Sequence, residues 1–418
     1  MQSNRLPMAG QLNSKISACS LGLLAVIVIF SSSMLDNSTF NYSTSAIAQP
    51  FIQTVKHRDL VIDLGNGIQT NAQLTFPAVG NGPFPGMLLV HGSGPVDMNE
   101  TLSPDSKPFW QIAHYLSERG FVVLRYDKRG VGENGTIIDT NVWGYATFDD
   151  LKNDAARALD VLIEQPEVDP NRITLVGHSE GTVIIPRLVI DLNNDNNNTS
   201  AGNLTKIANI VLMGVGAQNL IDIMHFQVVD NPLLYAHQVL DKKQSGSFSV
   251  QQPIEIPPLS QIVATHFGNS STSEYVDIES QLRPLLERTF ENITSGDTEA
   301  RCPATGICPV WVRSHAELEP TLDVIGNVSD STSILMMNGE NDSQSSVQQA
   351  FLLEQKLTEV NHPDHTLITY PDLGHVFSPS TQWFTELGPM EEYVLSDLYR
   401  WLSDHDNILR DLDRSLHP

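Results

Sequence analysis

One serine of this chain lies in the surroundings that a nucleophile needs. Gly177, Ser179 and Gly181 form a Gly-x-Ser-x-Gly motif between the apolar run 173–176 and a helical pattern. Glycines at this spacing permit a tight turn from strand to helix, which would lift the Ser179 hydroxyl above the edge of a sheet. The following helix would add free backbone amides and the positive end of its dipole. This context predicts that Ser179 is a nucleophile.

A serine nucleophile needs a base and a carboxylate that orients the base. In an open α/β sheet such groups lie beyond the carboxyl ends of the strands. His375 follows the expected strand 366–370 at that edge and is therefore the predicted base. Glu340 and Asp342 both follow the run 334–337. We favour Asp342, because it lies beyond the turn, where the loop can fold back toward His375.

Acyl transfer also needs donors for the negative oxygen that develops in the transition state. The segment 91–95, His-Gly-Ser-Gly-Pro, follows the apolar run 87–90 and is in the right place for such donors. We expect the first donor to be the backbone amide of Ser93 or, alternatively, that of Gly92. The second would be the amide of Glu180, which directly follows the nucleophile.

The elements that must position these residues alternate along the chain. Continuous apolar runs, typical of strands buried on both faces, are separated by helical patterns. Strands are expected within 51–76, with a turn at 64–67, and at 86–90, 121–126, 173–176, 207–213, 333–337 and 366–370. Helices are expected at 109–119, 148–165, 181–192, 346–358 and 390–403. The pattern predicts a mostly parallel sheet with helices on both faces, and a surface loop over the Asn-rich run 193–198.

This alternation stops between residues 216 and 325. Pro-rich and Ser-rich pieces occur there, together with helical stretches such as 280–289. We expect this segment to be an inserted, mainly helical cap. It would divide the α/β core into a first part, 51–215, and a second part, 326–418.

The first fifty residues are expected to direct export. Basic residues precede the segment 16–35, which has no charged residue, and a polar linker, 36–50, follows. This pattern fits a cleaved signal peptide or a retained membrane anchor. Both would leave the rest of the chain extracellular, either secreted or anchored on the outer face of the membrane. A disulfide between Cys302 and Cys308, which flank a short loop, would suit that location.

The composition excludes several classes of function. The chain has 418 residues and carries 24 Lys and Arg against 49 Asp and Glu, a formal net charge of −25. Nucleic-acid binding relies on basic side chains that neutralise phosphates, so we expect no nucleic-acid partner. Three cysteines are too few for a four-thiolate zinc site, and no P-loop, dinucleotide-binding or His-Glu-x-x-His motif occurs. We therefore expect no metal and no cofactor. The oligomeric state stays open.

The motifs together resemble a known family. α/β-Hydrolase esterases of the EstD type, and more broadly the serine aminopeptidase-like hydrolases, are similar to this chain at 91–97, 107–109, 124–130 and 177–181. The order Ser179, Asp342, His375 along the chain is also that of α/β-hydrolases. The resemblance implies a capped carboxylesterase that acts through these three residues on small-molecule esters. It gives residues 127–129 a structural loop role, and it does not extend to the cap, so acyl and alcohol specificity stay open.

Two alternatives also remain open. The same three residues could serve a peptidase, an aminopeptidase or a thioesterase. Amide hydrolysis would call for subsites that grip a chain, and an acidic pocket in the cap would favour peptide amino termini. A non-catalytic binding protein on a hydrolase scaffold is the other alternative, although the complete set of three residues argues against it.

Overall fold

The structure is a computed structural model that describes residues 54–80, 82–198, 206–268, 274–295 and 308–406. The expected leader, residues 1–50, and Cys302 lie outside the described residues. No helix in the described part of the chain has the length and apolar character that a membrane crossing requires.

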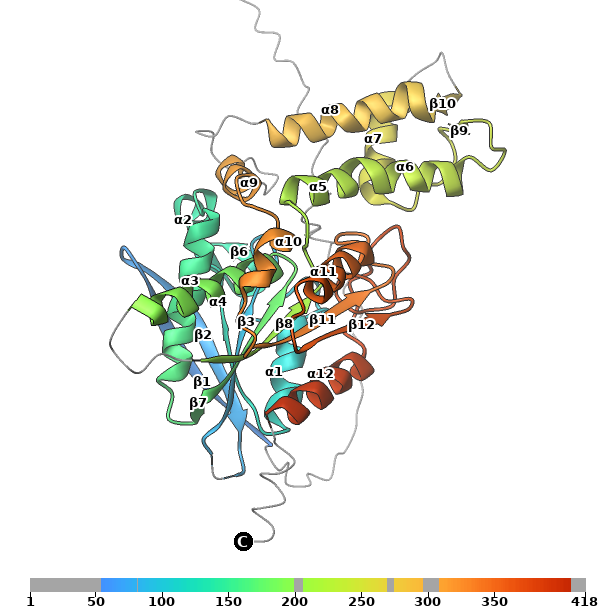
Figure 1. Cartoon of the computed structure of the whole chain (residues 1–418). Coiled ribbons are helices and arrows are strands. Elements are labelled where there is room, and N and C mark those ends of the chain that lie inside the picture. Colours follow the sequence, from blue (N-terminus) through green and yellow to red (C-terminus); the bar gives the residue numbers. More distant parts are fainter. Residues whose placement is uncertain (1–53, 81, 199–205, 269–273, 296–307, 407–418) are drawn as a thin grey trace, which may run out of the picture.

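An eight-stranded sheet forms the centre of the molecule, in the spatial order β1-β2-β4-β3-β7-β8-β11-β12 (Figure 1). These strands are β1 (Val55–Gly65), β2 (Ile68–Pro77), β3 (Phe84–Val90), β4 (Val122–Tyr126), β7 (Val168–His178), β8 (Ile207–Met213), β11 (Ser333–Gly339) and β12 (His365–Tyr370). The β1–β2 and β2–β4 pairs are antiparallel. All other neighbouring strands in this sheet are parallel. The predicted α/β-hydrolase fold with a mostly parallel sheet is confirmed.

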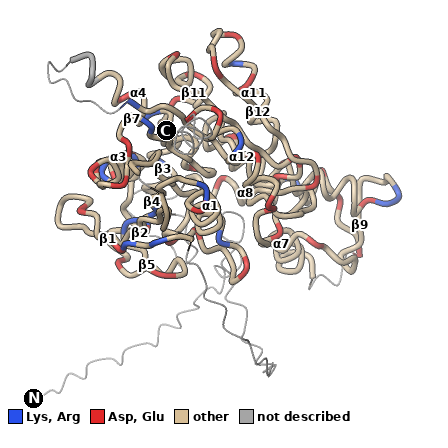
Figure 2. Tube along the Cα trace, turned by 90° about the horizontal axis from the view of Figure 1, so that it is seen from below, with Lys and Arg blue, Asp and Glu red and all other residues tan. Residues whose placement is uncertain are grey.

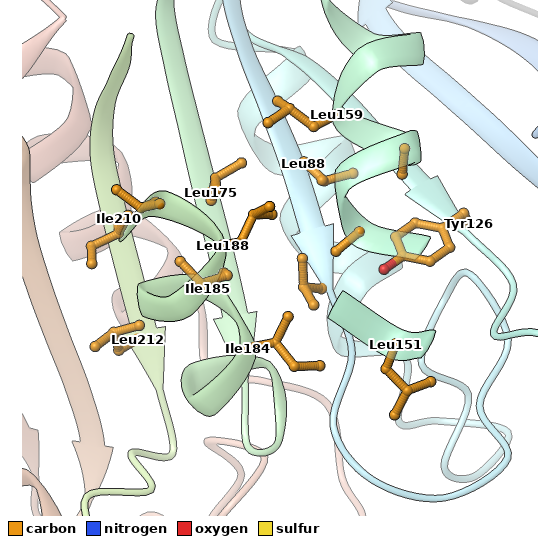
Figure 3. Close-up of a cluster of buried hydrophobic side chains, with 14 of the residues drawn as sticks. Leu88, Tyr126, Leu151, Leu159, Leu175, Ile184, Ile185, Leu188, Ile210 and Leu212 are labelled. Atoms are coloured by element: carbon orange, nitrogen blue, oxygen red, sulfur yellow. The ribbon is translucent and has the colours of Figure 1, made fainter. Parts of the chain in front are cut away.

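Helices cover both faces of the sheet, because side chains of the parallel strands alternate between two apolar layers. In β3, Leu88 and Val90 face one layer, which is completed by α3 (Phe148–Ile163), α4 (Gly181–Asn198) and α11 (Val347–Glu359). Met87 and Leu89 face the other layer, with α1 (Pro108–Ser117) and α12 (Glu392–His405). Figure 3 shows Leu159 of α3 and Ile185 of α4 over the first of these faces.

Helix α4 is longer than the sequence predicted. It continues through Asn198, so the expected surface loop at 193–198 is wrong. Asparagine is a poor helix former, but no glycine or proline occurs in this run to stop the helix. Two short pairs of strands were not predicted: β5 (Val131–Gly132) with β6 (Thr136–Ile137), and β9 (Ser247–Ser249) with β10 (Tyr275–Asp277).

The described residues of 216–325 are mainly helical, and α5 to α8 lie together to one side of the sheet (Figure 1). The elements are α5 (Leu220–His225), η2 (Phe226–Asp230), α6 (Asn231–Tyr235), η3 (Ala236–Leu240), α7 (Pro257–Phe267), η4 (Ile278–Leu282), α8 (Arg283–Thr294), α9 (Pro309–Ala316), α10 (Thr321–Val324) and η5 (Ile325–Asn327). The segment has an apolar core of its own, in which Val229, Leu259 and Leu286 are fully buried. Acidic positions are spread over this segment and over the sheet-bearing part alike (Figure 2).

Candidate active site

Ser179 lies at a sharp turn between β7 and α4. Its φ is 54°, in the left-handed region that a serine rarely adopts. A Cβ atom on Gly177 would come within 2.4 Å of the Gly181 carbonyl oxygen, and one on Gly181 within 2.2 Å of the Val90 carbonyl oxygen. Only glycine therefore fits on either side of the turn, which explains the spacing of the motif.

The structure brings His375 and Asp342 together. His375 Nδ1 donates to Asp342 Oδ2 at 2.7 Å, and both side chains are buried. The other carboxylate oxygen accepts the backbone amides of Gln344 and Ser345, at 2.8 and 2.7 Å. These three bonds fix the carboxylate and hold the imidazole with Nε2 as the nitrogen that can take a proton.

Glu340, the alternative carboxylate, points elsewhere. It is exposed, and its Oε1 accepts a hydrogen bond from the Thr369 hydroxyl at 2.8 Å. The turn after β11 thus separates the two acids, with Asp342 on the side of the imidazole.

Ser179 and His375 line the same cavity. Both residues are described, and no hydrogen bond joins the Ser179 hydroxyl to the imidazole. Such bonds are often long or poorly aligned before substrate binds, and they tighten in the complex. Gly214 fits closely beside the base, since a Cβ atom there would lie 3.0 Å from His375 Cε1.

The predicted oxyanion donors have free amides. Within the described part of the chain, the backbone N–H groups of Ser93 and Glu180 have no acceptor. The amide of Gly92, the alternative donor, is already engaged, because it donates to Glu100 Oε1 at 2.8 Å. Ser93 and Glu180 therefore remain the candidate donors for a negative oxygen near Ser179.

The Glu180 side chain is the centre of a buried polar cluster that the sequence did not predict. Its Oε2 pairs with Lys128 Nζ at 2.6 Å, and its Oε1 accepts the Trp311 indole N–H at 2.5 Å. His315 Nε2 lies 2.8 Å from Oε1, within ion-pair distance. Burial alone would raise the pKa of Glu180, but the attraction of Lys128 and His315 outweighs it and lowers the pKa to about 2.

His178 forms a second buried cluster beneath the site. Its Nδ1 faces Glu100 Oε1 at 3.0 Å, and its Nε2 faces the His375 carbonyl oxygen at 3.0 Å. Both partners are acceptors, so both ring nitrogens must carry protons. Burial acts to lower the pKa of His178, but the nearby Glu100 carboxylate raises it overall. His178 therefore has a structural role next to the candidate nucleophile.

Two cavities meet at Ser179. The Trp311 cavity is walled by Val183 of α4 and by apolar side chains such as Ile223 and Leu318. The Trp383 cavity is walled by His375 together with apolar side chains such as Leu102, Pro232 and Ile256. Ser93, Ser179, Gln227 and Gln344 line both cavities. The Gln227 amide donates to the Gln344 carbonyl at 2.8 Å, so the two glutamines stand between the cavities.

Sequence reasoning missed Lys128, Glu100, Trp311 and His315. Trp311 and His315 are four residues apart and lie on one face of α9, a spacing that could have indicated a joint contact. Lys128 and Glu100 gave no such signal, because their charged partners Glu180 and His178 lie 52 and 78 residues away in the sequence. In the described residues, no group of three or more His, Cys, Asp or Glu side chains is arranged to hold a metal ion.

The chain belongs to the alpha/beta hydrolase family, whose model matches residues 87–387. Esterase EstD from Thermotoga maritima is 36% identical over 136 residues, which are 32% of this chain and 30% of EstD. The match thus spans about a third of that relative.

Similar solved structures include hypothetical protein PA2218 from Pseudomonas aeruginosa, with a TM-score of 0.49 and 16% identity over 88% of this chain and 100% of that one. A second is proline iminopeptidase from Mycobacterium smegmatis, with a TM-score of 0.47 and 14% identity over 84% of this chain and 99% of that one.

Proposed function

We propose that the protein is a serine hydrolase that cleaves carboxylic esters through an acyl-enzyme. Ser179 Oγ attacks the ester carbonyl carbon while His375 Nε2 takes the hydroxyl proton. The amides of Ser93 and Glu180 stabilise the oxyanion, and His375 returns the proton to the leaving alcohol. Water, activated by the same imidazole, then attacks the acyl-enzyme and releases the acid and the free serine.

One observation carries this proposal. The Asp342–His375 pair, at 2.7 Å, opens into the cavity that Ser179 lines at its strained turn. Two backbone amides occupy Asp342 Oδ1, and Oδ2 bonds His375 and so gives the imidazole a fixed orientation. The partial match to EstD, an esterase, supports the ester rather than the amide as the bond cleaved.

The two cavities suggest how a substrate would lie. His375 must protonate the leaving oxygen, so the alcohol part belongs in the Trp383 cavity, which His375 lines. The acyl part would then occupy the Trp311 cavity, which Glu180 lines and His375 does not. No Lys or Arg occurs among the described residues that line either cavity. These walls favour neutral esters with apolar groups on both sides over anionic ones.

Amide hydrolysis is the second candidate, favoured by one residue. Glu319 lines the Trp311 cavity and is exposed, so its carboxylate could accept the ammonium group of an aminoacyl substrate. Turnover of aminoacyl p-nitroanilides above that of p-nitrophenyl esters would favour the peptidase.

Replacement of Ser179 tests the proposal. The Ser179→Ala variant should lose ester turnover by at least about 10³-fold, since the nucleophile is gone, and it should no longer react with a fluorophosphonate probe. Ser331→Ala, a change at an exposed serine, is the matched control and should retain both properties. Half the wild-type activity in a folded Ser179→Ala protein would overturn the proposal.

We also propose that the protein is exported. Cys308 is disulfide-bonded, to a cysteine outside the described residues, and such bonds persist in oxidising compartments. The uncharged segment 16–35 is the candidate signal or anchor. Fractionation of cells and mass spectrometry of the mature amino terminus would test this, and a full-length protein confined to the cytoplasm would contradict it.

A further inference from the structure

Lys128 contacts both chain segments that carry the free amides. It lies in the loop after β4, and its side chain is only 4% exposed. Its ammonium donates to the Gly92 carbonyl oxygen at 2.7 Å, reaches the Gly94 carbonyl oxygen at 3.4 Å, and pairs with the Glu180 carboxylate at 2.6 Å. One cation thus joins the loop of Ser93 to the residue that follows Ser179.

The bond to Gly92 determines where the Ser93 amide points. The Gly92 carbonyl and the Ser93 N–H belong to the same peptide unit, which is trans. In a trans peptide these two groups point in opposite directions. A cation held on the carbonyl therefore turns the N–H away from Lys128, and it also polarises the unit so that the N–H becomes a stronger donor.

The second amide is held in the same manner. The Glu180 N–H shares its peptide unit with the Ser179 carbonyl, which accepts both the Thr182 amide at 2.9 Å and the Thr182 hydroxyl at 2.6 Å. The Glu180 side chain is in turn fixed by Lys128 on one oxygen and by Trp311 on the other. Each free N–H is thus oriented by hydrogen bonds that the carbonyl oxygen of the same peptide unit accepts.

A gain in stability alone does not account for the buried ion pair between Lys128 and Glu180. Two charges removed from water cost solvation energy, and an apolar pair of similar volume is often as stable or more so. Unlike an apolar contact, the ion pair is directional. It fixes the Gly92 carbonyl, the Glu180 carboxylate and the spacing between the two loops that carry them.

We propose that Lys128 is a positioning residue of the oxyanion site, where it sets the direction of the Ser93 amide and its spacing from the Glu180 amide. This inference rests on the ester hydrolase proposed above. It assigns to the loop after β4 a part in transition-state stabilisation, beyond the structural role that the resemblance implies.

The test compares Lys128→Met with the double variant Lys128→Met/Glu180→Gln. The single variant leaves a buried carboxylate without its cation, so it can fail by unfolding. The double variant removes both charges and should recover the thermal midpoint. In both, kcat for p-nitrophenyl acetate should fall by about 10²–10³-fold, the loss typical of one missing oxyanion donor, while KM changes by less than about threefold. Active sites are counted by burst titration, so that only folded enzyme is compared.

A second readout separates orientation from simple packing. Sulfur is a weak hydrogen-bond acceptor. Hydrogen bonds from the two amides therefore stabilise the transition state of a thionoester less than that of the matched oxygen ester. The ratio of oxygen-ester to thionoester turnover should therefore fall in the double variant. Lys152→Met removes a lysine of α3 that pairs with Asp191 at 2.5 Å, and this control should leave kcat and the ratio unchanged.

The outcomes distinguish the two proposals. If the wild type hydrolyses esters and Ser179 reacts with the fluorophosphonate, but the double variant keeps its kcat and its ratio, the role of Lys128 is overturned and the hydrolase stands. If the wild type neither hydrolyses esters nor reacts with the probe, both proposals fail together.

Discussion

The imidazole of His178 donates from Nε2 to the backbone carbonyl of His375 at 3.0 Å, and so links the nucleophile turn to the loop that carries the candidate base. On its other side it pairs with the buried Glu100 carboxylate. The residue next to Ser179 therefore supports the loop of the candidate base. Through Glu100, which accepts the Gly92 amide, it also supports the candidate oxyanion loop.

Loss of His178 should destabilise the fold. The His178→Ala variant leaves Glu100 buried and without its cation, so the free energy of unfolding should fall by about 3–5 kcal/mol, the cost of breaking a buried pair. Urea denaturation at pH 7 measures this. His237→Ala removes a more exposed partner of Glu279 and should cost less than about 1 kcal/mol. Equal, small losses in the two variants would contradict a supporting role for His178.

The two acids after β11 should differ sharply in their effect on catalysis. Asp342→Asn removes the charge that orients and stabilises the imidazole, so kcat should fall by about 10²–10⁴-fold. Glu340→Gln changes an exposed carboxylate that contacts Thr369, and kcat should remain within about twofold. Steady-state kinetics with p-nitrophenyl acetate measures kcat of both variants. A large loss in Glu340→Gln and none in Asp342→Asn would assign the orienting carboxylate to Glu340 instead.

The Glu180 carboxylate should make stability depend on pH in a defined window. Its pKa of about 2 lies below the ordinary value of 4.5, so its contribution is fully present above about pH 4.5 and is lost as the pH falls toward 2. The destabilisation caused by Glu180→Gln should therefore be constant from pH 7 to about pH 5 and shrink at lower pH. Urea unfolding of both proteins across this range is the measurement. If the difference in unfolding free energy between the two proteins increased on acidification, this prediction would be contradicted.

Narrowing each cavity with a tryptophan should slow a different set of esters. Ile223→Trp narrows the Trp311 cavity and should slow p-nitrophenyl decanoate more than p-nitrophenyl acetate, by about tenfold or more. Leu102→Trp narrows the Trp383 cavity and should slow naphthyl butyrate more than methyl butyrate. Relative kcat/KM values for the four esters measure both effects. If each tryptophan affected the other pair of esters instead, the acyl and alcohol sides would be reversed.

The parallel strands were predictable because their burial on both faces leaves short apolar runs, as in 210–213 and 334–337. The turn at Ser179 was predictable because two glycines are required within a few residues. In both cases neighbours in the sequence determine the outcome, so local patterns are sufficient.

The contacts of Lys128 were not predictable from such patterns. Its partners Gly92 and Glu180 lie on the loops after β3 and β7, and these loops meet at Lys128 only once the strands pair in register. The same is true of Trp311 and His315, since no periodicity within residues 216–325 shows that α9 contacts Glu180. Long-range polar contacts of this kind depend on the assembled fold.

The wall between the two cavities has a consequence for how new selectivity could arise. One half of it, Gln227, lies in the expected cap, residues 216–325, whereas the groups proposed to break the bond all follow strands of the sheet. Exchange of residues 220–295 alone, which leaves Trp311 and His315 beside Glu180, would thus change which substrates the protein accepts without altering the residues proposed to carry out the reaction.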